Sequence, residues 1–385
     1  MYFFLANLSI LELSYTTCVI PQMLGHFLAE RKSISFFRCA AQFYTFLFFG
    51  IAECYILSVM AYDRYVAIRD PLRHNNNITA GNQTSTSGFL LLAFSSHQEL
   101  LFPLFLVLYL AALLGNVLIL VAVGSDSRLQ TPMYVLLVNL SLADLCFTSA
   151  TVPRLLYALL TGDQTITHSA CLSQVFFFLM AGNVDSYVLA AMAWDRYVAI
   201  CKPLHYATVV TLPRCMVLLG AVWVGTALHS LLHTVLLARL TFCSNRVLPY
   251  FFCDLHPLIH LACSDTSLNY MMILVEGGSV IILPAICIVV SYVFIGAAVC
   301  QIRAPGGLRK AFSTCGSHLT VVILFYGTVV SVYLQPPGQM EGQEEPQDLV
   351  AIVMFSVVSP TLNPYIYSLQ NREIKAALTK LFMGN

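Results

Sequence analysis

Long apolar stretches constrain this chain more than any other feature of its sequence. Each is close to the ~20 residues that a helix needs to cross ~30 Å of hydrocarbon. Because lipid offers the backbone no hydrogen-bonding partner, such stretches form helices, whose backbone bonds close internally. The alternative, a large soluble protein with these helices buried inside it, is disfavoured because the chain is 58% hydrophobic and only 10% charged. The clearest stretches are Leu100–Val123, Met133–Leu156, Arg214–Leu237, Met271–Val299, His318–Leu334 and Val350–Tyr367.

A further span around Asp185 completes the pattern, which predicts an all-α membrane protein built as a seven-helix bundle. The formal net charge of zero, with no basic run, gives no support to nucleic-acid binding. The sequence contains no catalytic or nucleotide-binding constellation, so we expect no enzyme activity. Its first residues lack a basic region followed by a short apolar core, and we therefore expect the first inserted helix to direct targeting.

Residues 1–74 repeat residues 133–206 without a gap, and 29 of the 74 aligned positions are identical. Met1-Tyr2 matches Met133-Tyr134, and the Asp-Arg-Tyr-Val-Ala-Ile motif occurs in both copies. Chance does not produce such a match, so the first copy is a partial duplicate that holds counterparts of the second and third helices alone.

The chain is therefore expected to have four parts. Residues 1–74 are the partial copy, 75–98 an extracellular segment or linker, 99–370 the seven-helix domain, and 371–385 an amphipathic helix and tail. The segment Asn75–Gly88 is polar and carries glycosylation sequons at Asn77 and Asn82. Sequons also arise by chance, so the use of either one stays open.

The distribution of basic residues predicts the orientation. Lys and Arg gather on one set of loops and near the C-terminus, whereas the other side has little beyond Arg154, Arg239 and Arg246. Basic loops stay in the cytoplasm. We therefore expect a multi-pass plasma-membrane protein with a cytoplasmic C-terminus and an extracellular segment 75–88.

Two acidic residues, Asp144 and Asp185, fall inside predicted spans, where an ionised carboxylate costs about 2.5–3.5 kcal/mol. Facing carboxylates would lower that cost by binding a cation such as Na⁺ or by holding a proton. The alternative is that one is protonated within a polar cluster with Asn116 and Asn363. Asp144, Asp185 and Asn116 are the expected ligands if Na⁺ binds, and no other cofactor is expected.

The tripeptide Asp195-Arg196-Tyr197 ends the third span at the cytoplasmic boundary. An acid beside an arginine there can hold a switch closed until protonation or helix movement frees the arginine. The alternative is an arginine that only anchors the helix end.

These features together resemble the rhodopsin-like G-protein-coupled receptors, and more narrowly the olfactory receptors of tetrapods. The resemblance covers essentially all of residues 75–385, and the repeat makes 1–74 similar to part of a second such receptor. Trp194 and Gln370 depart from the usual residues, and the loop Arg303–Leu308 is short. The motifs that carry the resemblance are Gly115-Asn116, Leu129–Tyr134, Met192–Cys201, Lys202–Tyr206, Ser291-Tyr292, Lys310–Leu319 and Pro360–Leu369.

The resemblance implies roles for particular residues. Four loop cysteines allow three pairings; the family implies Cys171 with Cys253 and Cys243 with Cys263, the alternative being free thiols. Pro364 would interrupt helical hydrogen bonding and act as a hinge, and Asn371–Phe382 would lie on the cytoplasmic lipid surface. Activation and G-protein coupling would depend on Asp195, Arg196, Tyr197, Asn363, Pro364 and Tyr367.

The family also implies a ligand pocket between the outer halves of four helices, mostly apolar and suited to small volatile molecules. Glu276 would favour a ligand with a donor or positive charge, unless it reaches the outer interface instead. The alternative for the apolar residues in this set is that they only pack one helix against another. The expected ligand contacts are Phe178, Leu179, Gly182, Asn183, Ile273, Glu276, Gly277, Val280, Tyr326, Val329, Val330 and Tyr333.

The sequence thus predicts an odorant receptor that activates a stimulatory G protein and raises cyclic AMP. One alternative is ion or proton transport by the intramembrane acids, although the inverted repeats typical of transporters are not found. Another follows from topology: two fragment helices would leave His74 in the cytoplasm, whereas residue 75 should be outside. We therefore expect that either one fragment helix does not insert or, preferably, that residues 1–74 are not part of a native receptor, because a fused or mis-assembled reading frame joins two neighbouring receptor genes. A fused product would be non-functional.

Overall fold

The computed structural model describes residues 88–91, 98–243, 246–273, 280–300, 307–333 and 346–383, together with Thr16. The chain divides into two compact units, Met1–Thr86 and Ser87–Asn385, and the second holds all the described residues except Thr16. The repeat in 1–74, the sequons at Asn77 and Asn82, and the ligand predictions at Glu276 and Gly277 lie outside the described residues.

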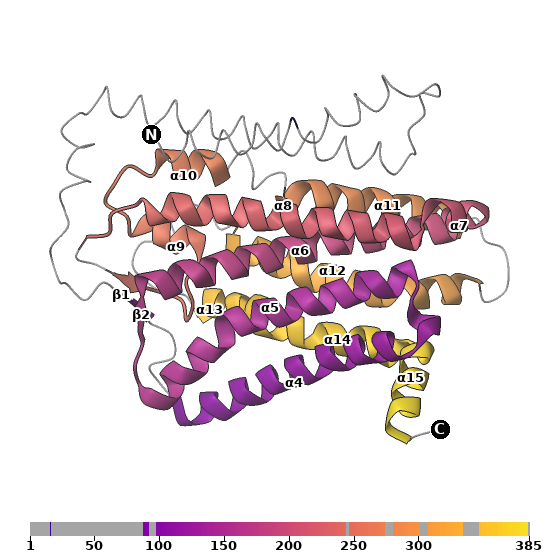
Figure 1. Ribbon diagram of the computed structural model, residues 1–385, viewed down its shortest axis with the longest axis horizontal. Helices are drawn as coiled ribbons and strands as arrows, with labels where there is room; N and C mark the ends of the chain where they lie inside the picture. Colours follow the sequence, from indigo (N-terminus) through magenta and orange to yellow (C-terminus); the bar gives the residue numbers. More distant parts are fainter. Residues whose placement is uncertain are drawn as a thin grey trace. The chain divides into compact units, whose positions relative to one another are not determined.

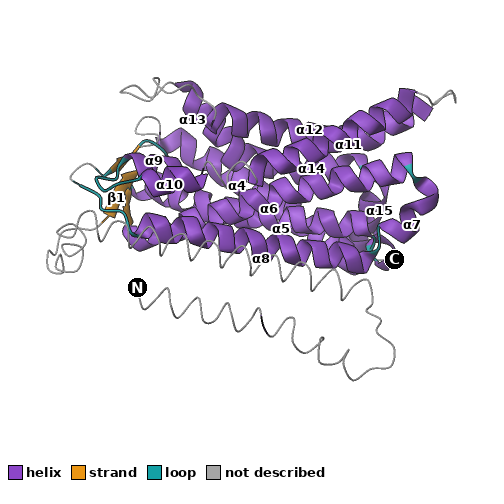
Figure 2. Cartoon of the chain, turned by 90° about the horizontal axis from the view of Figure 1, so that it is seen from above, coloured by secondary structure: helices purple, strands orange, loops and turns teal. Residues whose placement is uncertain are grey.

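The second unit contains the expected seven-helix bundle (Figures 1 and 2). In the described part of the chain, seven helical segments are long and apolar enough to cross a membrane. The last is a single path through α13, a five-residue π-helical turn at Met354–Val358, and α14. The helices are α4 (Gln98–Ser125), α5 (Pro132–Thr161), α6 (His168–Cys201), α8 (Leu212–Ala238), α11 (Leu283–Cys300), α12 (Gly307–Tyr333), α13 (Pro346–Val353) and α14 (Ser359–Gln370).

Local sequence explains where these helices begin and end. Pro132 opens α5 in the first turn, where its missing N–H is not needed. Gly162 closes α5 with a left-handed backbone, φ 75°, which glycine adopts without penalty. The side chain of Thr167 caps α6 by accepting a hydrogen bond from the Ala170 N–H.

Helix α6 is the centre of the bundle, because it packs against α5, α8, α11 and α12. Its inward residues are buried, whereas α4 and α11 expose much of their apolar surface. On α4, Leu100, Leu104 and Val107 are 51–72% exposed, as expected of side chains that face lipid. At Gly115 the helix meets α14 so closely that an added Cβ would lie 2.8 Å from Cγ of Pro364.

A small sheet and two short helices cover one end of the bundle. The strands lie in the order β2-β1-β3; β1 is antiparallel to β2, with Phe89 opposite Ile166, and parallel to β3, with Leu90 opposite Val247. Phe89, Leu91 and Ile166 are buried in this cap. The elements are β1 (Gly88–Leu91), β2 (Thr165–Thr167), β3 (Val247–Leu248), α9 (Leu255–His260) and α10 (Ser267–Met272).

The opposite end carries short connecting helices and the last helix of the chain. Ile374 and Ala377 of that last helix are buried, while Lys375 and Lys380 are exposed, which is the amphipathic pattern expected for it. The elements are the 3-10 turns Ser127–Leu129 and Pro203–His205, α7 (Tyr206–Val209) and α15 (Arg372–Met383).

Candidate functional site

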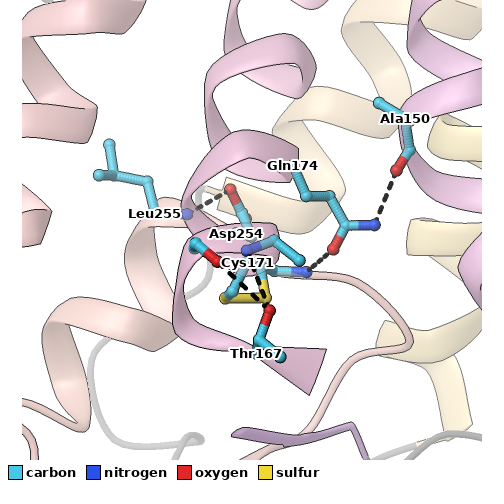
Figure 3. Close-up of a disulfide and its surroundings, with 9 residues drawn as sticks. Ala150, Thr167, Cys171, Gln174, Asp254 and Leu255 are labelled. Atoms are coloured by element: carbon cyan, nitrogen blue, oxygen red, sulfur yellow. Dashed lines mark hydrogen bonds between the residues drawn. A yellow bond between two sulfur atoms is a disulfide. The ribbon is translucent and has the colours of Figure 1, made fainter. Parts of the chain in front are cut away.

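A long loop between α8 and α11 is fastened over the capped end of the bundle. The structure joins Cys171, at the start of α6, to Cys253 in this loop (Figure 3). Gln174, one turn further along α6, accepts a hydrogen bond from the Cys253 N–H at 2.8 Å and donates one to the Ala150 carbonyl at 2.7 Å. The loop, α6 and α5 are therefore held together at one point.

A second disulfide, between Cys243 and Cys263, closes the loop around α9. Both pairings are those that the family resemblance implied. Asp254 begins α9: one carboxylate oxygen accepts from the Leu255 N–H at 2.7 Å and the other from the Tyr333 hydroxyl of α12 at 3.0 Å. Because Asp254 is 2% exposed, burial raises the pKa of its carboxyl to about 6.

Beneath the loop lies a cluster of aromatic side chains. Phe178 of α6 packs against Phe147 and Phe252, each with ring centroids 4.7 Å away, and against Phe355 at 5.9 Å. Phe147 also meets Phe355 edge-on at 5.2 Å. The rings come from α5, α6, the loop and the π-helical turn, so this cluster lies where four parts of the chain converge.

The expected ligand residues separate into those that face this cluster and those that do not. Phe178 belongs to it, Val329 is buried in the same hydrophobic core of the bundle, Leu179 packs against that core, and a Cβ on Gly182 would lie 3.3 Å from the Phe147 ring. Ile273 packs instead with the cap. Val330 is 50% exposed, on the same face of α12 as Ile323 seven residues earlier, and its contact with ligand stays a prediction.

Two polar contacts lie next to the apolar cluster. Asn183 of α6 reaches α8, with its Nδ2 3.1 Å from Nδ1 of His229. Ser186 bonds the Tyr326 hydroxyl at 2.9 Å and donates to the Val280 carbonyl at 3.2 Å, which links α6, α12 and the start of the fifth span. Ser186 was missed by the sequence reasoning, although it lies one turn after Asn183.

The intramembrane acids occupy the buried middle of the bundle. The amide of Asn363 donates to both oxygens of Asp144, at 3.0 and 3.1 Å. Asp185 is close enough for its charge to interact with that of Asp144, and its Oδ1 has no hydrogen-bond partner among the described residues. Asn116 donates to the carbonyls of Ala112 and Pro360. The polar cluster expected around Asp144 thus contains Asn363, whereas the Asn116 amide bonds to backbone.

At the other end of the bundle, Asp195 does not hold Arg196 in the expected ion pair. Its Oδ1 accepts from the Tyr206 hydroxyl at 2.8 Å, and within the described ranges the ion pair found is Arg128–Asp126. The half-buried Arg196 instead lies near the inner ends of several helices, where its charge acts on the tyrosines Tyr134, Tyr292 and Tyr367.

Two further contacts tie these inner ends together. The Tyr292 hydroxyl lies 2.7 Å from Nδ1 of His318, whose Nε2 is 3.0 Å from the Leu189 carbonyl, so α11, α12 and α6 are connected. The Tyr134 hydroxyl donates to Glu373 at 2.7 Å and docks α15 against α5. The sequence placed His318 and Tyr134 inside motifs but did not indicate their partners.

Comparison with known proteins gives a uniform result. The olfactory receptor family model matches the chain twice, over residues 1–108 and 105–385. Olfactory receptor 1f45 of Rattus norvegicus is 50% identical over 308 residues, 79% of this chain and 97% of that protein. Olfactory receptor 1N2 of Homo sapiens is 51% identical over 306 residues, 79% of this chain and 96% of that protein. These matches therefore cover nearly the whole of each relative but leave about a fifth of this chain unmatched.

Proposed function

The chain belongs to the olfactory receptor family, and on that premise we propose that it is an odorant receptor that signals through a stimulatory heterotrimeric G protein and raises cyclic AMP. The observation that carries the proposal is the 50% identity over nearly the whole length of a curated olfactory receptor. G-protein coupling follows from the family. The receptor would be a multi-pass protein of the plasma membrane, with its C-terminus and α15 in the cytoplasm, as the distribution of Lys and Arg favours.

The aromatic cluster and its polar neighbours support a small, mostly apolar ligand. Phe178, Val329 and Gly182 offer apolar surface, and the Ser186–Tyr326 pair offers a hydroxyl that can turn from its partner to a ligand. The loop fastened by Cys171–Cys253 covers this region. A ligand here would contact α6 and α12 together and would favour whichever arrangement of the two helices fits it better.

We further propose that Na⁺ occupies the acid site and stabilises the resting arrangement. Oxygen ligands suit a hard cation, and the buried side-chain oxygens without a hydrogen-bond partner among the described residues include Oδ1 of Asp185, of Asn116 and of Asn363. The Asp144 carboxylate accepts from the Asn363 amide and is close enough to Asp185 for their charges to interact. A cation would offset the cost of two buried carboxylates that interact with each other.

The inner ends of the helices suggest how ligand binding reaches the G protein. The charge of Arg196 reaches tyrosines of α5, α11 and α14, and His318 joins α12 to α6 and α11. Outward movement of α12 would break the His318 contacts and expose Arg196 to a partner. Pro364, inside α14, lets that helix bend beside Asn363 and Tyr367.

A cyclic AMP assay over an odorant panel tests the proposal, with response normalised to surface expression. Val329→Ala removes apolar surface from the hydrophobic core of the bundle. It should raise the odorant concentration that gives a half-maximal response about tenfold or more, because a buried valine contributes over 1 kcal/mol. Val330→Ala is the matched control, one residue away on the exposed face, and should leave it unchanged. Equal effects of the two substitutions, or no odorant response from any well-expressed chain, would count against the proposal.

The second candidate is a fusion product that does not signal. It is favoured by the two successive matches of one family model, since residues 1–108 match the family before 105–385 match it again. The fused helices would then misdirect insertion of the receptor that follows. RNA reads that span the His74–Asn75 junction, together with no surface signal from the full chain, would support this candidate. Reads that start upstream of Met1 and do not span the junction would indicate a mis-assembled reading frame instead.

A further inference from the structure

Two histidines stand side by side on the outer face of the loop helix α9. His256 and His260 are four residues apart, one helical turn, and their ring centroids are 4.8 Å from each other. The opposite face of α9 is buried through Leu258 and Ile259, each 1% exposed. His256 is half-buried and His260 exposed, so both imidazoles lie at the protein surface.

The backbone beneath this pair is fixed at both ends. Cys253 and Cys263, which flank α9, are both in disulfides, and Asp254 caps its first turn. Tyr270 of α10 packs beside the pair, with its ring centroid 6.2 Å from each imidazole. The two rings are therefore held near one another before any ligand arrives, which lowers the entropic cost of binding.

We propose that His256 and His260 form a chelating site for a borderline transition-metal ion, with Zn²⁺, Cu²⁺ and Ni²⁺ as the class of ligand. Imidazole nitrogens are preferred ligands of these ions, and histidines at positions i and i+4 of a helix place both nitrogens on one ion. Water would complete the coordination shell. Ca²⁺ and Mg²⁺ require oxygen ligands and should not bind.

The electrostatics of the pair are compatible with this role. Burial and the neighbouring His260 lower the pKa of His256, which favours the neutral imidazole, the form that binds metal. A similar pair in α8, His229 and His233 with centroids 4.6 Å apart, lies inside a membrane span, and His233 is 2% exposed. A hydrated ion in the extracellular medium would reach the α9 pair first.

Metal binding can be measured on the full chain purified in detergent with an epitope tag that contains no histidine. Increasing Zn²⁺ should raise Tm to a plateau, because an ion that binds the folded loop alone stabilises it. His256→Ala and His260→Ala should each raise the half-saturating concentration about tenfold or more, and the double substitution should add little, since a chelate needs both ligands. His168→Ala, a single histidine at the same end of the bundle, is the matched control and should leave the shift unchanged.

Several results would overturn the proposal. Independent sites would make each single substitution remove about half of the shift and the double substitution all of it. If the rise in Tm survives the double substitution, or if Mg²⁺ also produces it, the ion binds elsewhere. One equivalent of Cu²⁺ on the unaltered chain gives a second readout that does not depend on variants. Its electron paramagnetic resonance spectrum should show two imidazole nitrogens, and a spectrum with oxygen ligands alone would contradict the site.

Discussion

Asp254 shows how a single buried side chain can connect the loop to the helix bundle. It caps α9 through the Leu255 N–H and receives a hydrogen bond from Tyr333, so the loop and the outer end of α12 share one carboxylate. Tyr333 was expected to contact ligand, and this contact gives it a second role, as a tether between the loop and a helix that must move. The sequence offered no signal for it, because the partners are 79 residues apart.

The raised pKa of Asp254 predicts a pH dependence of stability. Folding raises this pKa from 3.8 to about 6, so the folded state binds the proton more tightly. The resulting stabilisation is complete below about pH 4 and is lost as the pH rises through about 6, and it amounts to at most about 3 kcal/mol. Asp254→Asn keeps the capping oxygen and cannot ionise. Between pH 4 and pH 7, the Tm of the variant should therefore rise relative to that of the unaltered chain; a constant difference would contradict this.

Asp195 and Tyr206 give a second prediction at this scale. Asp195 is 3% exposed, and its hydrogen bond to Tyr206 keeps its carboxylate engaged beside Arg196. Tyr206→Phe removes that bond, and the attraction between Asp195 and Arg196 then favours the ion pair that the sequence suggested. We expect a severalfold weaker odorant-stimulated cyclic AMP response at equal surface expression. Tyr157→Phe, at the outer end of α5, is the control, and a stronger response from Tyr206→Phe would refute the argument.

Among the elements, the helices were predictable and the directions of their faces were not. Apolar length placed α4, α5 and α8 close to their observed bounds, because about 20 apolar residues are needed to span lipid. In water, a polar face marks the outside of a helix, whereas in lipid both faces are apolar and the periodicity is weak. For this reason the sequence could not separate Val329, which is buried, from Val330, which is exposed. Small residues and polar groups are better indicators of the face that points into the bundle.

Gly115 is such a residue, and its role can be tested within one helix. A Cβ there would lie 2.8 Å from Cγ and 3.1 Å from Cβ of Pro364, so Gly115→Ala must push α4 away from α14. We expect a loss of about 1–3 kcal/mol, measured as a lower Tm and reduced surface expression. Gly124→Ala, in the same helix with nothing within 4 Å of the added Cβ, should be neutral or slightly stabilising. Equal losses from both substitutions would show that the close approach to Pro364 does not matter.

For the whole molecule, the decisive question is how the repeat affects insertion. An even number of crossings in residues 1–74 would place residue 75 on the wrong side for the seven helices that follow. We therefore expect a C-terminally tagged full chain to give little surface signal and the chain without residues 1–74 to give a strong one, by flow cytometry. Equal surface levels would mean that the fragment inserts with an odd number of crossings or not at all.

The proposed receptor requires an odd number of crossings between residue 75 and the C-terminus. That number can be measured directly on the full chain by inserting short protease-cleavable epitopes at Asn77 and after Asn385 and treating sealed membranes from one side. A seven-helix topology places the two epitopes on opposite sides, so we expect one to be cleaved and the other protected. Cleavage or protection of both together would contradict the seven-helix topology and, with it, the proposed receptor.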